Sequence, residues 1–158
     1  DQLKQIAAMI PGTRVLIMMR APYARLVSNY NHAYRHFPDM LETDAAALKW
    51  LGSKTVTDRV EYARLIRDAR AAFGEENTLC LFFEDMVNDP ELFLRGILDF
   101  IGVEFHPAVL TEIDRRKTKG AEKRPMSETL QSAFHARVAH VAGEVEPLLG
   151  RVPENWKS

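Results

Sequence analysis

Residues 14–37, RVLIMMRAPYARLVSNYNHAYRHF, predict a strand that leads directly into a helix, and this arrangement decides the fold class. The apolar run Val15–Met19 is typical of a strand buried on both faces of a parallel sheet. Arg20 stands where that strand should end, and Pro22 suits the first turn of a helix. In α/β proteins, anions bind at the carboxyl ends of parallel strands, beside helix N-termini. This corner therefore predicts a phosphate-binding site.

The predicted helix over residues 22–37 has two contrasting faces. Its apolar positions recur with helical spacing and should face the core: Leu26, Tyr30, Ala33 and Phe37. The opposite face combines two cations, a hydroxyl and an imidazole: Arg25, Ser28, His32 and Arg35. A plain solvent face is the alternative, but such a face usually includes acids and this helix has none. We therefore expect the polar face to lie close to Arg20.

The formal net charge of −1 conceals a segregation of charge along the chain. Residues 1–38 carry five Lys/Arg and one acid, whereas residues 39–113 carry seven Lys/Arg and fifteen acids. Residues 114–124, DRRKTKGAEKR, carry six Lys/Arg and two acids. Two basic segments in a nearly neutral protein suggest one anionic ligand held from two sides, and solvated surface is the alternative.

A second apolar run, TLCLFF at residues 78–83, predicts another parallel strand. Asn88 and Asp89 before Pro90 predict the start of a helix, and Gly102 its end. Helices are predicted over approximately residues 3–10, 44–50, 58–73, 90–101 and 127–149. This alternation favours a single α/β domain over residues 1–158, built on a parallel sheet. Two strands are few, because a sheet usually has about four to six.

The composition is ordinary for a soluble globular domain, with 46% hydrophobic and 27% charged residues in a chain of 158. No apolar run approaches the roughly 20 residues that span a bilayer, and no charged-then-apolar leader opens the sequence. The single Cys80 cannot form an internal disulfide. We therefore expect a cytoplasmic protein with no membrane segment in this chain.

Three segments together resemble the sulfotransferases that use 3′-phosphoadenylyl sulfate (PAPS), with bacterial members nearest. The first is RAPYARLVSNYNH at residues 20–32, with an Arg and a Ser eight residues apart after a strand. The second, residues 62–103, is similar to the family's helix, strand, acidic turn, Asp-Pro helix and closing Phe-Ile-Gly-Val. The third is KTKGAEKRP at residues 117–125. The resemblance implies a three-layer α/β sandwich like that of P-loop nucleotide transferases.

The resemblance also implies which residues bind the nucleotide. Arg20 and Ser28 would hold its 3′-phosphate, while Lys117, Lys119 and the backbone at Gly120 would close over the same end. The residue types suit the task, because a guanidinium offers a planar fork, a hydroxyl donates a hydrogen bond, and a glycine lets backbone N–H groups approach. By the same resemblance, the helix that opens near residue 62 passes near the adenine.

The implied reaction transfers a sulfuryl group from PAPS to a hydroxyl or amine of a small-molecule or glycan acceptor and releases PAP (3′,5′-ADP). No metal is implied, and a homo-oligomer is compatible with the resemblance. The family's N-terminal Gly-rich phosphosulfate loop, with its Lys and Ser/Thr, finds no match here, since the only early glycine is Gly12. We therefore expect this chain to be the C-terminal portion of a longer enzyme, carrying the 3′-phosphate half of the site.

The catalytic base remains unassigned, since family members place it upstream of the matching segments. His32 and His36 are expected to be structural or solvent-facing, and Glu84-Asp85 to serve as turn and capping residues. Trp50 and Trp156 are expected to pack in a core or interface rather than stack on a base. The acceptor pocket is expected among the loops and helices of residues 37–57.

Two other functions compete with the sulfotransferase. A non-catalytic nucleotide- or anion-binding module of the same fold would explain the missing loop. A kinase-like transferase is disfavoured, because no Gly-x-x-x-x-Gly-Lys-Ser/Thr loop is present. Nucleic-acid binding is weaker still, because the basic segments lack interleaved aromatics and the pI is about 6.6.

Overall fold

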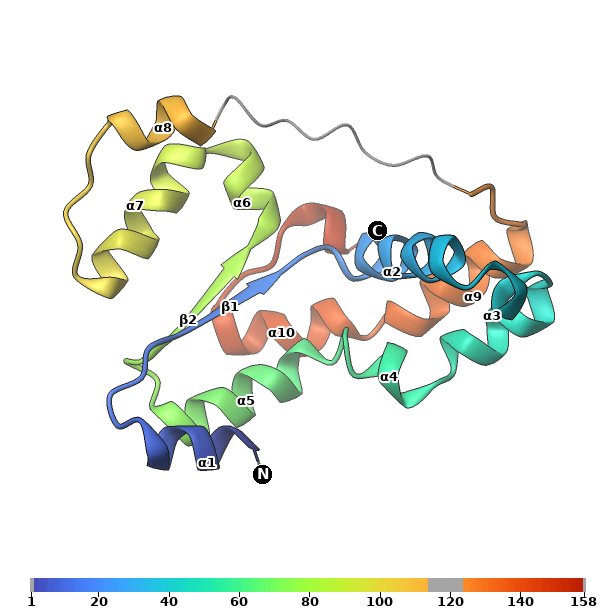
Figure 1. The fold of residues 1–158 in the computed structure, drawn as a ribbon, viewed down its shortest axis with the longest axis horizontal. Coiled ribbons are helices and arrows are strands. Elements are labelled where there is room, and N and C mark those ends of the chain that lie inside the picture. The colour runs from blue at the N-terminus through green and yellow to red at the C-terminus, as the bar shows by residue number, and fades with distance from the viewer. Residues whose placement is uncertain (1, 114–123, 158) are drawn as a thin grey trace. The chain divides into compact units, whose positions relative to one another are not determined.

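The computed structural model describes residues 2–113 and 124–157 (Figure 1). Contacts between residues divide the chain into two compact units. The first unit comprises residues 1–19 and 66–121, and the second comprises residues 20–65 and 122–158. No helix in the described ranges combines the length and the apolar character needed to cross a membrane.

The first unit contains the sheet. Strand β1 (Val15–Met19) pairs in parallel with β2 (Thr78–Phe82), with Val15 opposite Thr78 and Met19 opposite Phe82. These are the two apolar runs that the sequence identified as strands, and within the described residues the sheet has two strands. The parallel pairing confirms the predicted α/β class.

The prediction that β1 is buried on both faces was wrong. Ile17 and Met19 are only 6% and 0% exposed, but Leu16 and Met18 are 45% and 52% exposed. Successive side chains of a strand point to opposite faces of the sheet, and the described parts of the chain cover only one of them. Strand β1 is therefore only half buried, although its sequence is an unbroken apolar run.

The helices of the first unit are α1 (Gln2–Met9), α6 (Phe83–Asn88), α7 (Pro90–Ile101) and α8 (Ala108–Ile113). Helices α1 and α7 lie close to their predicted bounds, whereas α6 and α8 were not predicted. The carboxylate of Asp89 accepts a hydrogen bond of 3.0 Å from the Leu92 N–H at the start of α7. At its end Gly102 has a φ of +77° and the Arg14 guanidinium donates to the Phe100 carbonyl at 2.7 Å. Among the apolar residues of α7, Phe93 is buried, whereas Leu92 and Ile101 are exposed.

The second unit is helical. It contains α2 (Pro22–His36), the 3₁₀ helix η1 (Pro38–Leu41), α3 (Asp44–Leu51), α4 (Lys54–Thr57), α9 (Glu128–Val138), α10 (Val141–Leu149) and the 3₁₀ helix η3 (Glu154–Trp156). Helix α5 (Tyr62–Phe73) begins in this unit and continues into the first. The core is built where α2, α3 and α9 meet, with Tyr30 and Phe134 edge to face at 5.7 Å between ring centroids.

Two helix boundaries differ from the prediction. The helix expected to start at Thr57 or Asp58 starts at Tyr62 instead, because Asp58 bonds side chains rather than helix N–H groups. Its two carboxylate oxygens accept from Lys54 Nζ at 2.5 Å and Arg64 Nη2 at 2.9 Å. The single helix predicted over residues 127–149 is broken into α9 and α10. Five apolar residues with helical spacing are buried along the two helices: Leu130, Phe134, Val138, Val141 and Val145.

Candidate functional site

The predicted phosphate corner lies at the start of α2. Ala21 is the N-cap and Pro22 follows, as the sequence indicated, and no described side chain caps the first turn. The first turn also contains no acid, and the positive end of a helix favours an anion. Arg20 immediately precedes this turn and is exposed.

Tyr62 fixes the backbone at this corner. Its hydroxyl donates a 3.0 Å hydrogen bond to the Arg20 carbonyl, across 42 residues of sequence. The Tyr62 ring is buried and lies 5.5 Å from the Trp156 ring, centroid to centroid. Tyr62 therefore acts on the orientation of Arg20, a role that the sequence could not reveal.

Ser28 lies on the polar face of α2, and every residue predicted for that face is exposed: Arg25, Ser28, His32 and Arg35. Arg20 and Ser28, the two predicted site residues within the described ranges, are thus both accessible to a ligand. The other three, Lys117, Lys119 and Gly120, lie outside the described residues.

Arg124 is a site-supporting residue that sequence analysis missed. Its backbone N–H donates to Asn31 Oδ1 at 2.9 Å, and its guanidinium donates to the carbonyls of Leu41 at 2.7 Å and Glu42 at 3.2 Å. The guanidinium carbon also lies 3.9 Å from the Tyr34 ring centroid. Arg124 was visible only as one base in a basic run, because its partners are 82 to 93 residues away in sequence.

A second anchor holds the segment that follows Arg124. Ser127 Oγ accepts from the Leu130 N–H at 3.1 Å as the N-cap of α9, and donates to Asp44 Oδ2 at 2.5 Å. Asp44 lies in the first turn of α3. The chain that leaves the basic segment is therefore tied to α2, to the end of η1 and the residue after it, and to α3.

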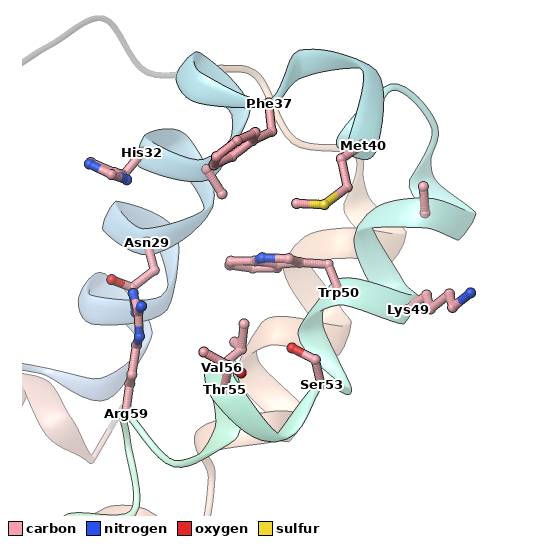
Figure 2. Close-up of a pocket in the computed structure, with 12 residues that line it drawn as sticks. Asn29, His32, Phe37, Met40, Lys49, Trp50, Ser53, Thr55, Val56 and Arg59 are labelled. Atoms are coloured by element: carbon pink, nitrogen blue, oxygen red, sulfur yellow. The ribbon is translucent and has the colours of Figure 1, made fainter.

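A cavity of about 750 Å³, hereafter the Trp50 cavity, lies among α2, η1, α3 and α4. Figure 2 shows Asn29 and His32 on the α2 side, the Trp50 indole facing them, and Phe37 and Met40 above the indole. Eight of its twelve lining residues lie within residues 37–57, the region where an acceptor pocket was expected. Trp50 packs at the core edge, 5.8 Å from the Tyr30 ring, while its indole also lines the cavity.

Asn29 carries an unusual feature of the cavity wall. Its side chain is 9% exposed, and its Nδ2 atom finds no hydrogen-bond partner in the described part of the chain. Leaving a buried donor unpaired costs about 1–3 kcal/mol, so such a group calls for an explanation. Its burial follows from its place on α2 between the core stripe and the polar face.

The remaining titratable candidates have local roles. His32 and His36 are exposed and their ring centroids are 4.5 Å apart, one turn apart on α2. Glu84 and Asp85 lie in the first turn of helix α6 and not in an irregular turn. Negative charge in the first turn of a helix stabilises that helix.

The fold also brings together three side chains that could ligate a metal ion: Glu61, His140 and Glu144 place ligand atoms within 4.8 Å of one another. His140 Nε2 lies 3.8 Å from Glu61 Oε1, an ion pair when the imidazole is protonated.

Comparisons with known proteins identify the family of this chain and a similar fold. A family model described as "Sulfotransferase family" matches residues 1–107. A crystal structure of a sulfotransferase from Alicyclobacillus acidocaldarius superposes with a TM-score of 0.68 and 22% sequence identity over 99% of this chain. This chain spans 62% of that protein's chain. No curated protein sequence matches it.

The structural likeness confirms the predicted P-loop-like α/β fold, and the family match confirms the resemblance noted in the sequence. The matched range includes β1, α2 and β2, and hence Arg20, Ser28 and the Trp50 cavity. Because the family model covers residues 1–107 of 158, this chain belongs to the sulfotransferase family.

Proposed function

We propose that this chain carries the 3′-phosphate-binding half of a PAPS-dependent sulfotransferase. The observation that carries the proposal is the start of α2, where an exposed Arg20 precedes an uncapped, acid-free first turn among the described residues. The guanidinium supplies a charged fork for phosphate oxygens, and Ser28 supplies a hydroxyl two turns further along the helix. Lys117, Lys119 and the backbone at Gly120 are the proposed partners from the basic segment.

The anchoring of Arg124 supports a role for that segment. Asn31, which accepts the Arg124 N–H, is one helical turn from Ser28. Arg124 is the last residue of the basic segment, so the described end of that segment lies against the helix that carries Ser28.

The reaction would be an in-line displacement at sulfur. The acceptor oxygen or nitrogen forms a bond to sulfur as the bond from sulfur to the 5′-phosphate oxygen breaks, and the acceptor's proton passes to a base. This chain's part is to hold the departing nucleotide by its 3′-phosphate, with fixed cations in place before charge develops. The acceptor would be a small molecule or glycan with a hydroxyl or amine.

Calorimetry with 3′,5′-ADP tests the clamp. Arg20→Ala should weaken binding by about tenfold or more, as loss of a charged hydrogen bond does, and Ser28→Ala by a smaller factor. Arg95→Ala, which removes an exposed cation from α7, is the matched control and should leave the affinity unchanged. Equal affinities for the Arg20→Ala variant and the parent chain would overturn the assignment.

The second candidate is a non-catalytic nucleotide-binding module, favoured by the lack of a Gly-rich loop with Lys-Ser/Thr in this sequence. Sulfate transfer from labelled PAPS should be assayed both for this chain and for the natural gene product that contains it. Transfer by either supports the enzyme. Binding of 3′,5′-ADP without transfer by either supports the module.

A further inference from the structure

We infer that Glu61, His140 and Glu144 bind a divalent transition-metal ion such as Zn²⁺. The three side chains, hereafter the Glu61 trio, all belong to the second unit. They come from two places in the chain, the residue before α5 and the start of α10. The inference does not depend on the proposed function, because no member of the trio belongs to the proposed phosphate clamp.

The ligand atoms of the trio lie close to the spacing that a metal ion needs. One imidazole nitrogen and one oxygen from each carboxylate lie within 4.8 Å of one another, and His140 Nε2 is 3.8 Å from Glu61 Oε1. Metal–ligand bonds of about 2.0–2.2 Å in a tetrahedral site place neighbouring ligand atoms about 3.4 Å apart. Small rotations of the exposed His140 and Glu144 side chains would therefore complete three bonds to one ion, and water would supply the fourth.

Helix α10 fixes the backbone of two of the ligands. His140 and Glu144 are one helical turn apart, and the Glu144 N–H donates to the His140 carbonyl at 3.2 Å. The residue after each of them is in the core, since Val141 and Val145 are only 2% and 0% exposed. The imidazole and the carboxylate therefore lie on the same side of α10, beside its buried stripe.

Glu61 brings the third ligand from the segment that leads into α5. Its neighbours Val60 and Tyr62 are both buried, and its carbonyl accepts a hydrogen bond of 3.1 Å from the Leu65 N–H in the first turn of α5. Ligands carried by packed elements are held in place before the ion arrives. A bound ion would thus link the start of α10 to the start of α5.

The charges of the trio favour a divalent cation over a simple ion pair. Glu61 and His140 can pair when the imidazole is protonated, but Glu144 adds a second carboxylate at the same place. Even with a protonated imidazole the trio keeps one net negative charge. Within residues 2–113 and 124–157, no Lys or Arg side chain forms an ion pair with either glutamate of the trio. A divalent ion would supply the positive charge that these neighbours do not.

The types of the ligand atoms select the kind of ion. Mg²⁺ and Ca²⁺ prefer sites made of oxygen ligands, whereas an imidazole suits Zn²⁺ and its neighbours in the first transition row. Three protein ligands with water in the fourth position is also an arrangement that Zn²⁺ adopts in proteins. We therefore expect the trio to bind Zn²⁺ at least about tenfold more tightly than Mg²⁺.

Calorimetric titration of Zn²⁺ into the chain, prepared without a histidine tag, tests the site. His140→Ala and Glu144→Gln should each weaken Zn²⁺ binding by about tenfold or more, because even changes in groups that only support metal ligands cost about 10- to 100-fold. Both side chains are exposed, so neither change should disturb the core.

His36→Ala is the matched control. His32 and His36 are another place where Zn²⁺ could meet two imidazoles, since their ring centroids are 4.5 Å apart on α2. The affinity of the Glu61 trio should be unchanged in His36→Ala. Zn²⁺ binding that is lost in His36→Ala and kept in His140→Ala would overturn the inference, and so would a chain that binds no Zn²⁺.

Thermal unfolding separates a metal site from an ion pair. Zn²⁺ bound to the native chain should raise the unfolding midpoint above its value in EDTA, and this rise should be absent in Glu144→Gln. In EDTA, Glu144→Gln should unfold at the midpoint of the parent chain or slightly above it, because the change removes repulsion between two carboxylates. A midpoint of the parent chain that Zn²⁺ leaves unchanged would show that the trio is only an ion pair.

Discussion

Among single residues, Arg124 joins parts of the second unit that are 82 to 93 residues apart in sequence. One side chain and its own N–H engage Asn31, Leu41 and Glu42, and the guanidinium stacks on Tyr34. Only arginine offers a planar fork that can donate to two carbonyls while its face lies on an aromatic ring. A lysine at this position would keep the charge and lose the geometry.

We predict that Arg124→Ala lowers the free energy of unfolding by about 1–3 kcal/mol, the usual cost of hydrogen bonds to a charged group. Urea unfolding followed by circular dichroism measures this change. The free energy of unfolding of Arg124→Lys should lie between those of the parent chain and Arg124→Ala, since lysine retains one charged donor. If the lysine variant matches the parent chain, the fork and the stacking contribute nothing and the anchoring role is wrong.

Asp58 provides a pH-dependent prediction. Its hydrogen bond from Lys54, with the positive charges of Lys54 and Arg64, lowers the pKa of Asp58 below its ordinary value. A carboxyl whose pKa is lower in the folded state stabilises the fold above its unfolded pKa and loses that contribution as pH falls through the native pKa.

Asp58→Asn should therefore be less stable than the parent chain at pH 7, and the difference should be smaller at about pH 3, where protons begin to bind the parent carboxyl. Chemical unfolding at the two pH values gives the comparison. Lys157, whose pKa is raised by its hydrogen bond with Glu146, titrates far above this range and does not interfere. A difference that is undiminished at low pH would show that Asp58 acts through shape rather than charge.

At the level of helices and strands, local signals predicted more than distant ones. The start of α7 was predicted from Asp89 and Pro90, and the end of the helix from Gly102, because caps depend on residues within one turn. The start of α5 was not predicted correctly, because the carboxylate of Asp58 bonds the side chains of Lys54 and Arg64 and does not cap a helix. Hydrophobicity predicted β1 as a strand but not its exposed face.

The same contrast applies to the candidate site. Arg20 and Ser28 were recognisable from their spacing after a strand, which is a local pattern. Asn29 was not, because no local pattern shows that its amide nitrogen is buried without a partner among the described residues. Arg124 and Tyr62 act through partners 82 to 93 and 42 residues away, and no spacing rule relates such positions.

The N-cap of α7 yields a prediction at this scale. Asp89→Ala removes the 3.0 Å hydrogen bond to the Leu92 N–H and a negative charge at the helix start, so it should cost about 1 kcal/mol of stability. Asp89→Asn keeps the cap and should cost much less. The unfolding midpoints of the two variants measure these changes. An equal loss of stability in both variants would assign the effect of Asp89 to its charge alone.

For the whole molecule, the division into two units raises the question of cooperativity. The chain passes from one unit to the other near residues 19, 65 and 121, and α5 is a continuous helix whose residues belong to both. Because α5 has residues in both units, unfolding of either unit would also remove part of a helix that the other unit shares. We therefore expect a single cooperative transition, as a single domain would show.

The sequence provides a separate probe in each unit. Trp50 and Trp156 are both in the second unit, so tryptophan fluorescence reports that unit, while Cys80 in β2 reports the first. Burial raises the pKa of the Cys80 thiol, so the native protein should react slowly with iodoacetamide and faster once β2 opens. Coincident midpoints by fluorescence and by labelling are expected, and separated midpoints would show two independent domains.

The parallel pairing of β1 and β2 also sets an order of events during synthesis. Val15 pairs with Thr78, so β1 leaves the ribosome long before its partner exists, and a loop of more than sixty residues must close before the first ladder bond forms. Closure of long loops slows folding, and unpaired apolar strands are prone to associate with other chains. Leu16 and Met18 add to this hazard, because they remain exposed even after pairing. The corner at Arg20 thus acquires its final shape late, and nascent chains stalled before residue 78 should bind chaperones that recognise apolar strands.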